Sequence, residues 1–303
     1  MNDRLTILQL TDAAGSRAAS APGRAGSAEA SAAVASAPGS ASAGVDAATD
    51  AVARYALGLG DDALVLAQRL GEWIANAPEL EEDVALGNIG LDLLGHARAL
   101  LTYAGSAWGR TEDDLAYFRE EAQFQSRWLF ELPNGPDGGR DFAFTILRQL
   151  IASLYFGALY RRLASSSDET LAAIAAKAVK EVAYHAEHAT LWTLRLGLGT
   201  DESHRRMTRA LADLWPFMGE LFAPDPAVRA LVAAGIDTVA VAPESLCDEV
   251  LAVVGSVLED SGLAVPEVPF LQGGGRLGRH SEQFGRLVGE MQLLARAHPG
   301  ATW

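Results

Sequence analysis

Cysteine is almost missing from the 303 residues, and Cys247 is the single example. One thiol excludes an internal disulfide and any metal cluster held by several thiolates, so a reducing compartment suits this chain. The first ten residues, MNDRLTILQL, contain one arginine and an apolar stretch interrupted by Gln9, which makes them a poor signal peptide. We therefore expect a cytoplasmic protein.

Positive charge is scarce as well. The chain has 24 lysine and arginine residues against 39 aspartate and glutamate residues, which gives a formal net charge of −15. Nucleic acids and anionic membrane surfaces are bound by clustered lysine and arginine, so this composition argues against both as partners. No uninterrupted apolar run approaches the roughly 18 to 20 residues that a membrane span needs.

The first 51 residues have few large apolar side chains. From Ala13 to Ala51 the sequence is mostly alanine, serine, glycine and proline, and Val34 and Val45 are the only larger apolar residues. Such a segment cannot offset its loss of conformational entropy through burial. We predict a disordered tail over residues 1–51 and one folded domain over residues 52–303.

The folded part lacks any sustained alternation of apolar and polar residues, which argues against a sheet. Apolar residues at three- and four-residue spacing instead predict helices throughout. The predicted helices span residues 52–76, 79–104, 141–163, 168–196 and 201–222, with others within 113–125, 243–262 and 278–296. Four long helices followed by shorter ones predict an all-α bundle with additional C-terminal helices.

Two histidines continue the apolar stripes of the second and fourth predicted helices. A di-iron carboxylate bundle takes a Glu-x-x-His motif from each of two helices. Here the residue three places before His96 is Leu93, and the residue three places before His185 is Val182. The histidines of such a motif are present, but its glutamates are replaced by apolar residues.

Acidic residues do lie nearby, one position too early. Asp92 and Glu181 are four residues before His96 and His185, but they lie about 100° around the helix from each stripe. Two iron ions need several carboxylates for neutralisation and bridging, so we interpret this position as metal-free. The alternative is a di-iron oxidase with slipped ligand spacing that uses Asp92, His96, Glu181 and His185.

Two further motifs are less specific. His188 lies three residues after His185, a spacing that could serve zinc, but no third ligand is evident and we expect His188 to be exposed. Glycines 273–275 resemble a phosphate-binding loop, although no predicted strand precedes them. We interpret this glycine run as a turn.

Four segments carry a resemblance to a known family. They are YALGLGDDALVLAQRLGEW (residues 55–73), APELEEDVALGNIGLDLLGHAR (77–98), AAKAVKEVAYH (175–185) and EMQLLARAHPGATW (290–303). Together they closely resemble the C subunits of bacterial phenylacetyl-CoA epoxidase, the multicomponent oxygenase of phenylacetate catabolism. The resemblance covers nearly everything after Val52.

The resemblance implies a ferritin-like, structural subunit without an active site or cofactor of its own. It implies pairing with a homologous A subunit that carries the di-iron centre and binds the acyl-CoA. It further implies a small B subunit that bridges the assembly and a separate reductase that contains a flavin and an iron–sulfur cluster.

The resemblance also assigns a vestigial di-iron site by position. Glu72, His96 and His185 match three ligand positions of the catalytic subunit, and Leu93, Val182 and Ser153 replace its remaining carboxylates. Because Glu72 would be costly to bury alone, we expect it to form a hydrogen bond with one of the two histidines.

Overall fold

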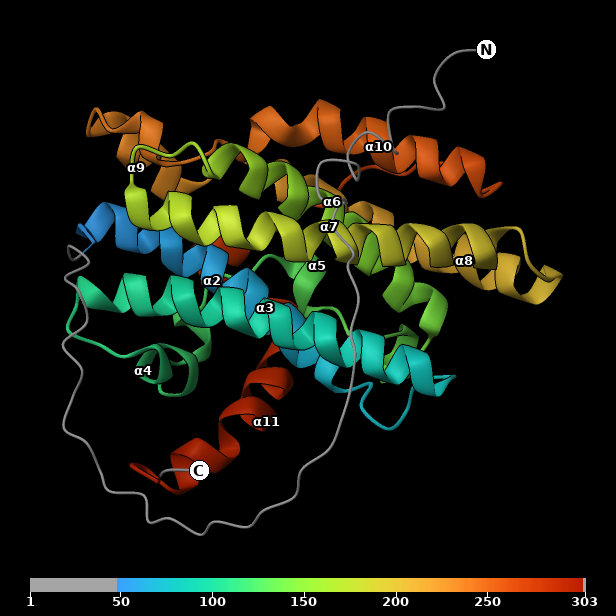
Figure 1. The fold of residues 1–303 in the computed structure, drawn as a ribbon. Helices are drawn as coiled ribbons and strands as arrows, with labels where there is room; N and C mark the ends of the chain where they lie inside the picture. The colour runs from blue at the N-terminus through green and yellow to red at the C-terminus, as the bar shows by residue number, and fades with distance from the viewer. Residues whose placement is uncertain (1–47, 302–303) are drawn as a thin grey trace, which may run out of the picture. The chain divides into compact units, whose positions relative to one another are not determined.

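The structure is a computed structural model, and it describes residues 48–301. In this range the chain is helical and contains no strand, which confirms the predicted all-α class. Residues 1–47 of the predicted tail lie outside the described residues. Four long helices make up the bundle, namely α2 (Asp50–Gly71), α3 (Leu80–Ser106), α6 (Phe142–Leu163) and α7 (Glu169–Gly197) (Figure 1).

Shorter helices surround these four, consistent with a ferritin-like bundle that has additional C-terminal helices. The α-helices among them are α4 (Glu112–Tyr117), α5 (Trp128–Glu131), α8 (Asp201–Leu214), α9 (Pro226–Ala233), α10 (Cys247–Asp260) and α11 (Phe284–Ala297). Short 3-10 turns connect them, namely η2 (Glu121–Gln123), η3 (Pro136–Gly138), η4 (Trp215–Phe222), η5 (Asp237–Val239), η6 (Pro243–Leu246) and η7 (Gly275–Leu277).

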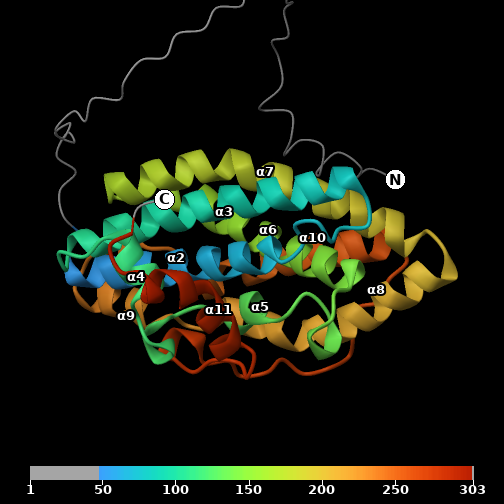
Figure 2. The ribbon, with the colours of Figure 1, turned by 90° about the horizontal axis from the view of Figure 1, so that it is seen from below.

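A glycine lets α2 and α3 approach closely at one point. A Cβ atom added to Gly60 would lie 2.9 Å from the Leu101 side chain, closer than Cβ atoms normally come to other atoms. Seen from below, α3 lies along α2 on one side and along α7 on the other (Figure 2). The two predicted histidine stripes, one on α3 and one on α7, therefore belong to neighbouring helices.

Most residues of helix α6 are buried in the core. It is the one helix in the described part of the chain that is long and apolar enough to cross a membrane by length and composition. However, 83% of its most apolar window is buried inside the protein, as expected for a core helix. Arg148 and Gln149 interrupt its apolar sequence, so α6 contains no uninterrupted apolar run of membrane-spanning length.

Several predicted helix ends are wrong. The first helix ends at Gly71 and not at Asn76, because the chain turns and Ala75 adopts a left-handed backbone with φ of 62°. The predicted helix over residues 201–222 is two elements, α8 and the 3-10 turn η4. Pro216 has no N–H and its ring crowds the preceding turn, so α8 cannot continue through it. Helix α9 was not predicted.

A network of buried charges joins α2 to distant parts of the chain. Asp61 and Asp62 are fully buried on α2. Asp61 accepts a hydrogen bond of 3.0 Å from Arg119, and Asp62 accepts one of 2.6 Å from Arg127. Arg276, from the C-terminal third, also donates to Asp62 at 2.6 Å. The network thereby fastens the segment after α10 to the first helix of the bundle.

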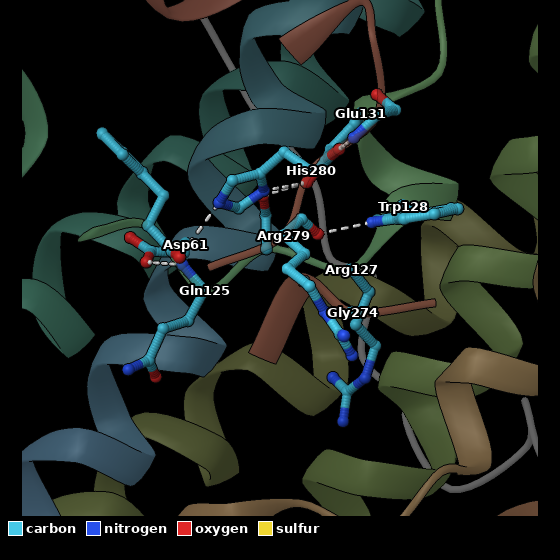
Figure 3. A network of polar contacts seen from close by, with 12 residues as sticks. Asp61, Gln125, Arg127, Trp128, Glu131, Gly274, Arg279 and His280 are labelled. Carbon is cyan, nitrogen blue, oxygen red and sulfur yellow. Dashed lines mark hydrogen bonds and ion pairs between the residues drawn. The ribbon is translucent and has the colours of Figure 1, made fainter. Parts of the chain in front are cut away.

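The same C-terminal segment makes a second set of polar contacts, shown in part in Figure 3. The Glu131 carboxylate accepts hydrogen bonds from His280 Nδ1 at 2.7 Å and from the Ser281 N–H at 2.8 Å. The indole N–H of Trp128 donates to the Arg279 carbonyl at 2.7 Å. These contacts place the 3-10 turn η7 and the start of α11 against α5.

Candidate functional site

The two histidine stripes meet between α3 and α7. His96 and His185 are buried, and Leu93 and Val182 one turn before them have no exposed surface. The residues that replace the motif glutamates are therefore fully packed into the core. Both positions face the core, as the apolar stripes of the two helices predict.

Each histidine is hydrogen-bonded by a carboxylate of the opposite helix. His96 Nε2 lies 2.7 Å from Glu181 Oε2, and His185 Nε2 lies 3.0 Å from Asp92 Oδ2. The two helices run antiparallel, so a histidine and an acid four residues apart on α3 face an acid and a histidine four residues apart on α7. The position of Asp92 and Glu181 about 100° from each stripe therefore does not keep their carboxylates away from the histidines.

The phase of a single helix does not show which side chains of a neighbouring helix can reach it. Asp92 and Glu181 do lie off the core stripe and are partly exposed. Their side chains nevertheless reach across the helix contact to the buried imidazoles. An antiparallel alignment of the two sequences would have revealed the reciprocal pairs.

A third pair of the same kind extends the contact. His188 Nε2 lies 2.8 Å from Glu82 Oε2, and both side chains are largely buried. The prediction that His188 is exposed was wrong, because an acidic residue of the first turn of α3 covers it. Three histidine–carboxylate pairs thus join α3 to α7.

The surroundings of His96 and His185 favour the neutral imidazole. Burial lowers the pKa of His96 and of His185, although the neighbouring carboxylates Glu181 and Asp92 act in the opposite direction. A neutral ring that donates through Nε2 has no proton on Nδ1. The Nδ1 atom of His96 is buried without a hydrogen-bond partner, which fits this tautomer because an unpaired acceptor costs less than an unpaired N–H.

The donor atoms do not converge as a metal site requires. Among the described residues, no group of three or more histidine, cysteine, aspartate or glutamate side chains is placed to hold a metal ion. Each Nε2 atom that could bind a metal already meets a carboxylate oxygen. The four residues of the slipped-spacing alternative, Asp92, His96, Glu181 and His185, are brought together, but as two separate pairs.

Glu72 does not join the histidines, so the predicted hydrogen bond to one of them was wrong. Glu72 is the C-terminal cap of α2, and its carboxylate accepts hydrogen bonds of 2.8 Å from Arg69 and from Asn134. The turn at the end of α2 carries this side chain toward the connection that follows α5. Its charge is therefore balanced without any histidine.

Ser153, the replacement that the resemblance assigns to α6, also uses its polar group locally. Ser153 is buried on α6, and its hydroxyl donates to the Leu150 carbonyl of the same helix at 3.2 Å. A neighbouring polar residue of α6, Arg148, is fully buried, and burial lowers its pKa to about 9. It donates to the Leu132 carbonyl and to Asn134 Oδ1, both at 2.5 Å.

The glycine run before η7 is a turn, as predicted, and it binds a carboxylate of its own chain. Glu220 Oε1 accepts hydrogen bonds of 2.8 Å from the backbone N–H groups of Gly274 and Gly275. The second oxygen of Glu220 accepts a hydrogen bond of 2.7 Å from the backbone N–H of Trp128. The backbone donors that a phosphate would use are therefore occupied by Glu220.

Comparisons with known proteins agree with the resemblance seen in the sequence. A family model described as phenylacetic acid catabolic protein matches residues 39–303. The C subunit of 1,2-phenylacetyl-CoA epoxidase from Escherichia coli (strain K12) is 46% identical over 250 residues. That alignment covers 82% of this chain and 98% of the relative, so the similarity extends over nearly the whole folded part.

Proposed function

The chain belongs to the phenylacetic acid catabolic protein family, and we propose that it is a non-catalytic subunit of a phenylacetyl-CoA epoxidase. Its role in phenylacetate catabolism would be to pair with the di-iron A subunit and stabilise it. A B subunit and a reductase with a flavin and an iron–sulfur cluster would complete the assembly. We place this assembly in the cytoplasm and assign no cofactor to this chain.

One observation carries the proposal. At the position where a di-iron bundle holds its metal, Leu93 and Val182 fill the core and the histidines are hydrogen-bonded to carboxylates across the α3–α7 contact. Buried polar groups that satisfy each other fix how two helices meet. This is the chemistry of a packing interface, and it supports a structural role.

The test is metal analysis of the chain expressed alone, together with co-expression of the A subunit. We expect no stoichiometric iron in the isolated chain and a stable complex with the A subunit. Stoichiometric iron with oxygen consumption in the absence of the A subunit would contradict the proposal. Failure to form any complex would contradict the proposed pairing.

A second candidate function is an independent di-iron oxidase that uses Asp92, His96, Glu181 and His185. The proximity of these four residues favours it, although they form two pairs without a shared centre. If it is correct, the isolated chain binds iron, and the double variant His96→Gln/His185→Gln loses that iron. If the structural role is correct, the same variant changes stability and leaves the iron content of the complex intact.

A further inference from the structure

Helix α3 exposes a row of large apolar side chains on its outer side. The side chains of Leu80, Val84, Leu91 and Leu94 are 76%, 55%, 65% and 43% exposed. We call these four residues together with Gly87 the α3 stripe. Single exposed leucines are common on proteins, but a row of them along one helix marks an interaction surface.

The spacing of the α3 stripe is that of a helix seam. Residues 80, 84, 87, 91 and 94 follow one another at alternating steps of four and three. This is the repeat by which two helices pack side by side with interlocking side chains. In Figures 1 and 2, α3 lies at the outside of the bundle and has α2 and α7 along its inner edges. The inner edges are occupied by the chain itself, and the stripe lies outside them.

Gly87 leaves open space in the middle of the α3 stripe. A glycine in a helix interior costs about 1 kcal/mol relative to alanine. A Cβ at Gly87 would meet no atom within 4 Å, so no packing contact among the described residues requires glycine there. This open space leaves room for the backbone of another helix to approach α3 closely.

The charge around the stripe indicates the chemistry of the occupant. Glu79, Glu81 and Asp83 surround its N-terminal end, and one oxygen of Asp83 is buried without a hydrogen-bond partner. The only lysine or arginine within α3 is Arg98. A second copy would bring two chains of net charge −15 together, so lysine and arginine from a different protein complement this surface better.

From these observations we infer that the α3 stripe docks a helix of the partner subunit that has an apolar seam flanked by lysine and arginine. The inference rests on the proposed function and identifies the surface through which this chain engages the A subunit. Leu91 lies at the centre of the contact, and the partner helix passes over Gly87. The acidic N-terminal end of α3 sets the direction of that helix.

The test measures binding of full-length variants to the A subunit of the same epoxidase, by co-purification and by titration. Val84→Lys/Leu91→Lys adds charge to the seam and should weaken binding at least about 100-fold. The matched control, Val232→Lys/Leu198→Lys, changes residues of the same types with exposures of 56% and 65%, outside the α3 stripe. This control should bind like the wild type, and both variants should melt at the wild-type temperature.

A second variant separates docking from folding. Gly87→Leu fills empty space and improves helix propensity, so it should keep or raise the melting temperature while it weakens binding at least tenfold. Glu81→Lys should weaken binding and reduce its dependence on salt.

Three outcomes would overturn the inference. Wild-type affinity in both Val84→Lys/Leu91→Lys and Gly87→Leu would show that the A subunit binds elsewhere, and the proposed function would stand. A wild-type homodimer that these variants dissociate would make a second copy the occupant. If the wild-type chain does not bind the A subunit at all, the inference fails together with the proposed function.

Discussion

At the scale of single residues, the α3–α7 contact depends on which histidine nitrogen holds a proton. His96 and His185 each meet a carboxylate through Nε2, and each is buried enough to disfavour its charged form. Sequence patterns identified both histidines and their apolar neighbours Leu93 and Val182. They did not reveal the carboxylate partners, because a stripe describes one helix and a hydrogen bond across a contact requires two.

The neutral histidines predict a pH dependence of stability. The folded-state pKa of both is lowered from the ordinary value of 6.5, so the unfolded chain binds protons first as the pH falls. The contribution of these two histidines to the free energy of unfolding should therefore be constant above about pH 6.5. It should decline as the pH falls below that value. Urea unfolding between pH 5 and pH 8 measures this slope.

Replacing the histidines should remove that dependence. His96→Gln/His185→Gln keeps a hydrogen-bond donor and lacks the titration, so its unfolding free energy should vary less below pH 6.5. His298→Gln, at an exposed position, should leave the wild-type slope unchanged. Equal slopes in the wild type and the double variant would show that the two histidines are not preferentially neutral in the folded protein.

Truncation of Leu93 and of its neighbour Leu94 should destabilise the protein to different extents. Leu93→Ala removes a fully buried side chain and should lower the free energy of unfolding by about 2–5 kcal/mol. Leu94→Ala, one position along the same helix, removes a partly exposed side chain and should cost less than about 1 kcal/mol in the isolated chain. Similar losses in urea unfolding would mean that α3 presents a different face to the core.

At the scale of elements, helices were predictable and their connections were not. The four long helices are present in the structure because apolar residues recur with the helical period, a property of the local sequence. Glu72 was misplaced because α2 ends at Gly71, and that end depends on a left-handed turn at Ala75 which no periodicity encodes. The glycine run was correctly predicted as a turn, but its contact with Glu220 joins residues about fifty positions apart.

The glycine turn should not tolerate a side chain at its buried position. A Cβ at Gly275 would lie 1.7 Å from the Ser126 carbonyl oxygen, and backbone cannot move aside easily. Gly275→Ala should cost about 3 kcal/mol or more in urea unfolding. Gly255→Ala, within α10 where no atom lies within 4 Å, should instead raise stability by up to about 1 kcal/mol. A harmless Gly275→Ala would mean that η7 does not pack against this carbonyl.

At the scale of the whole molecule, buried charges hold the C-terminal third to the bundle. Arg276 donates to Asp62 on α2 and to Asp225 before α9. Burial alone would raise the pKa of Asp225, but Arg276 and Arg127 lower it below its usual value. The network thereby combines three distant parts of the sequence into one unit, and no local sequence pattern indicates it.

Breaking this network should release the C-terminal segment. Arg276→Met leaves buried carboxylates without their partner and should cost about 3–5 kcal/mol. Hydrogen exchange should show the largest loss of protection in residues 273–297. Arg286→Met, which removes a largely exposed ion pair with Glu290, should cost less than about 1 kcal/mol. Unchanged protection in Arg276→Met would show that the apolar packing of α11 suffices.

The long separation within this network has a consequence for biosynthesis. Asp62 and its partner Arg276 are 214 positions apart. At about 5–20 residues per second, a ribosome needs roughly 10 to 40 seconds to make the intervening chain. During that time α2 can pack against α3, and Asp61 and Asp62 can bind Arg119 and Arg127. The contact of Asp62 with Arg276 cannot yet form. The contact between Arg276 and Asp62 can therefore form only after most of the polypeptide has left the ribosome.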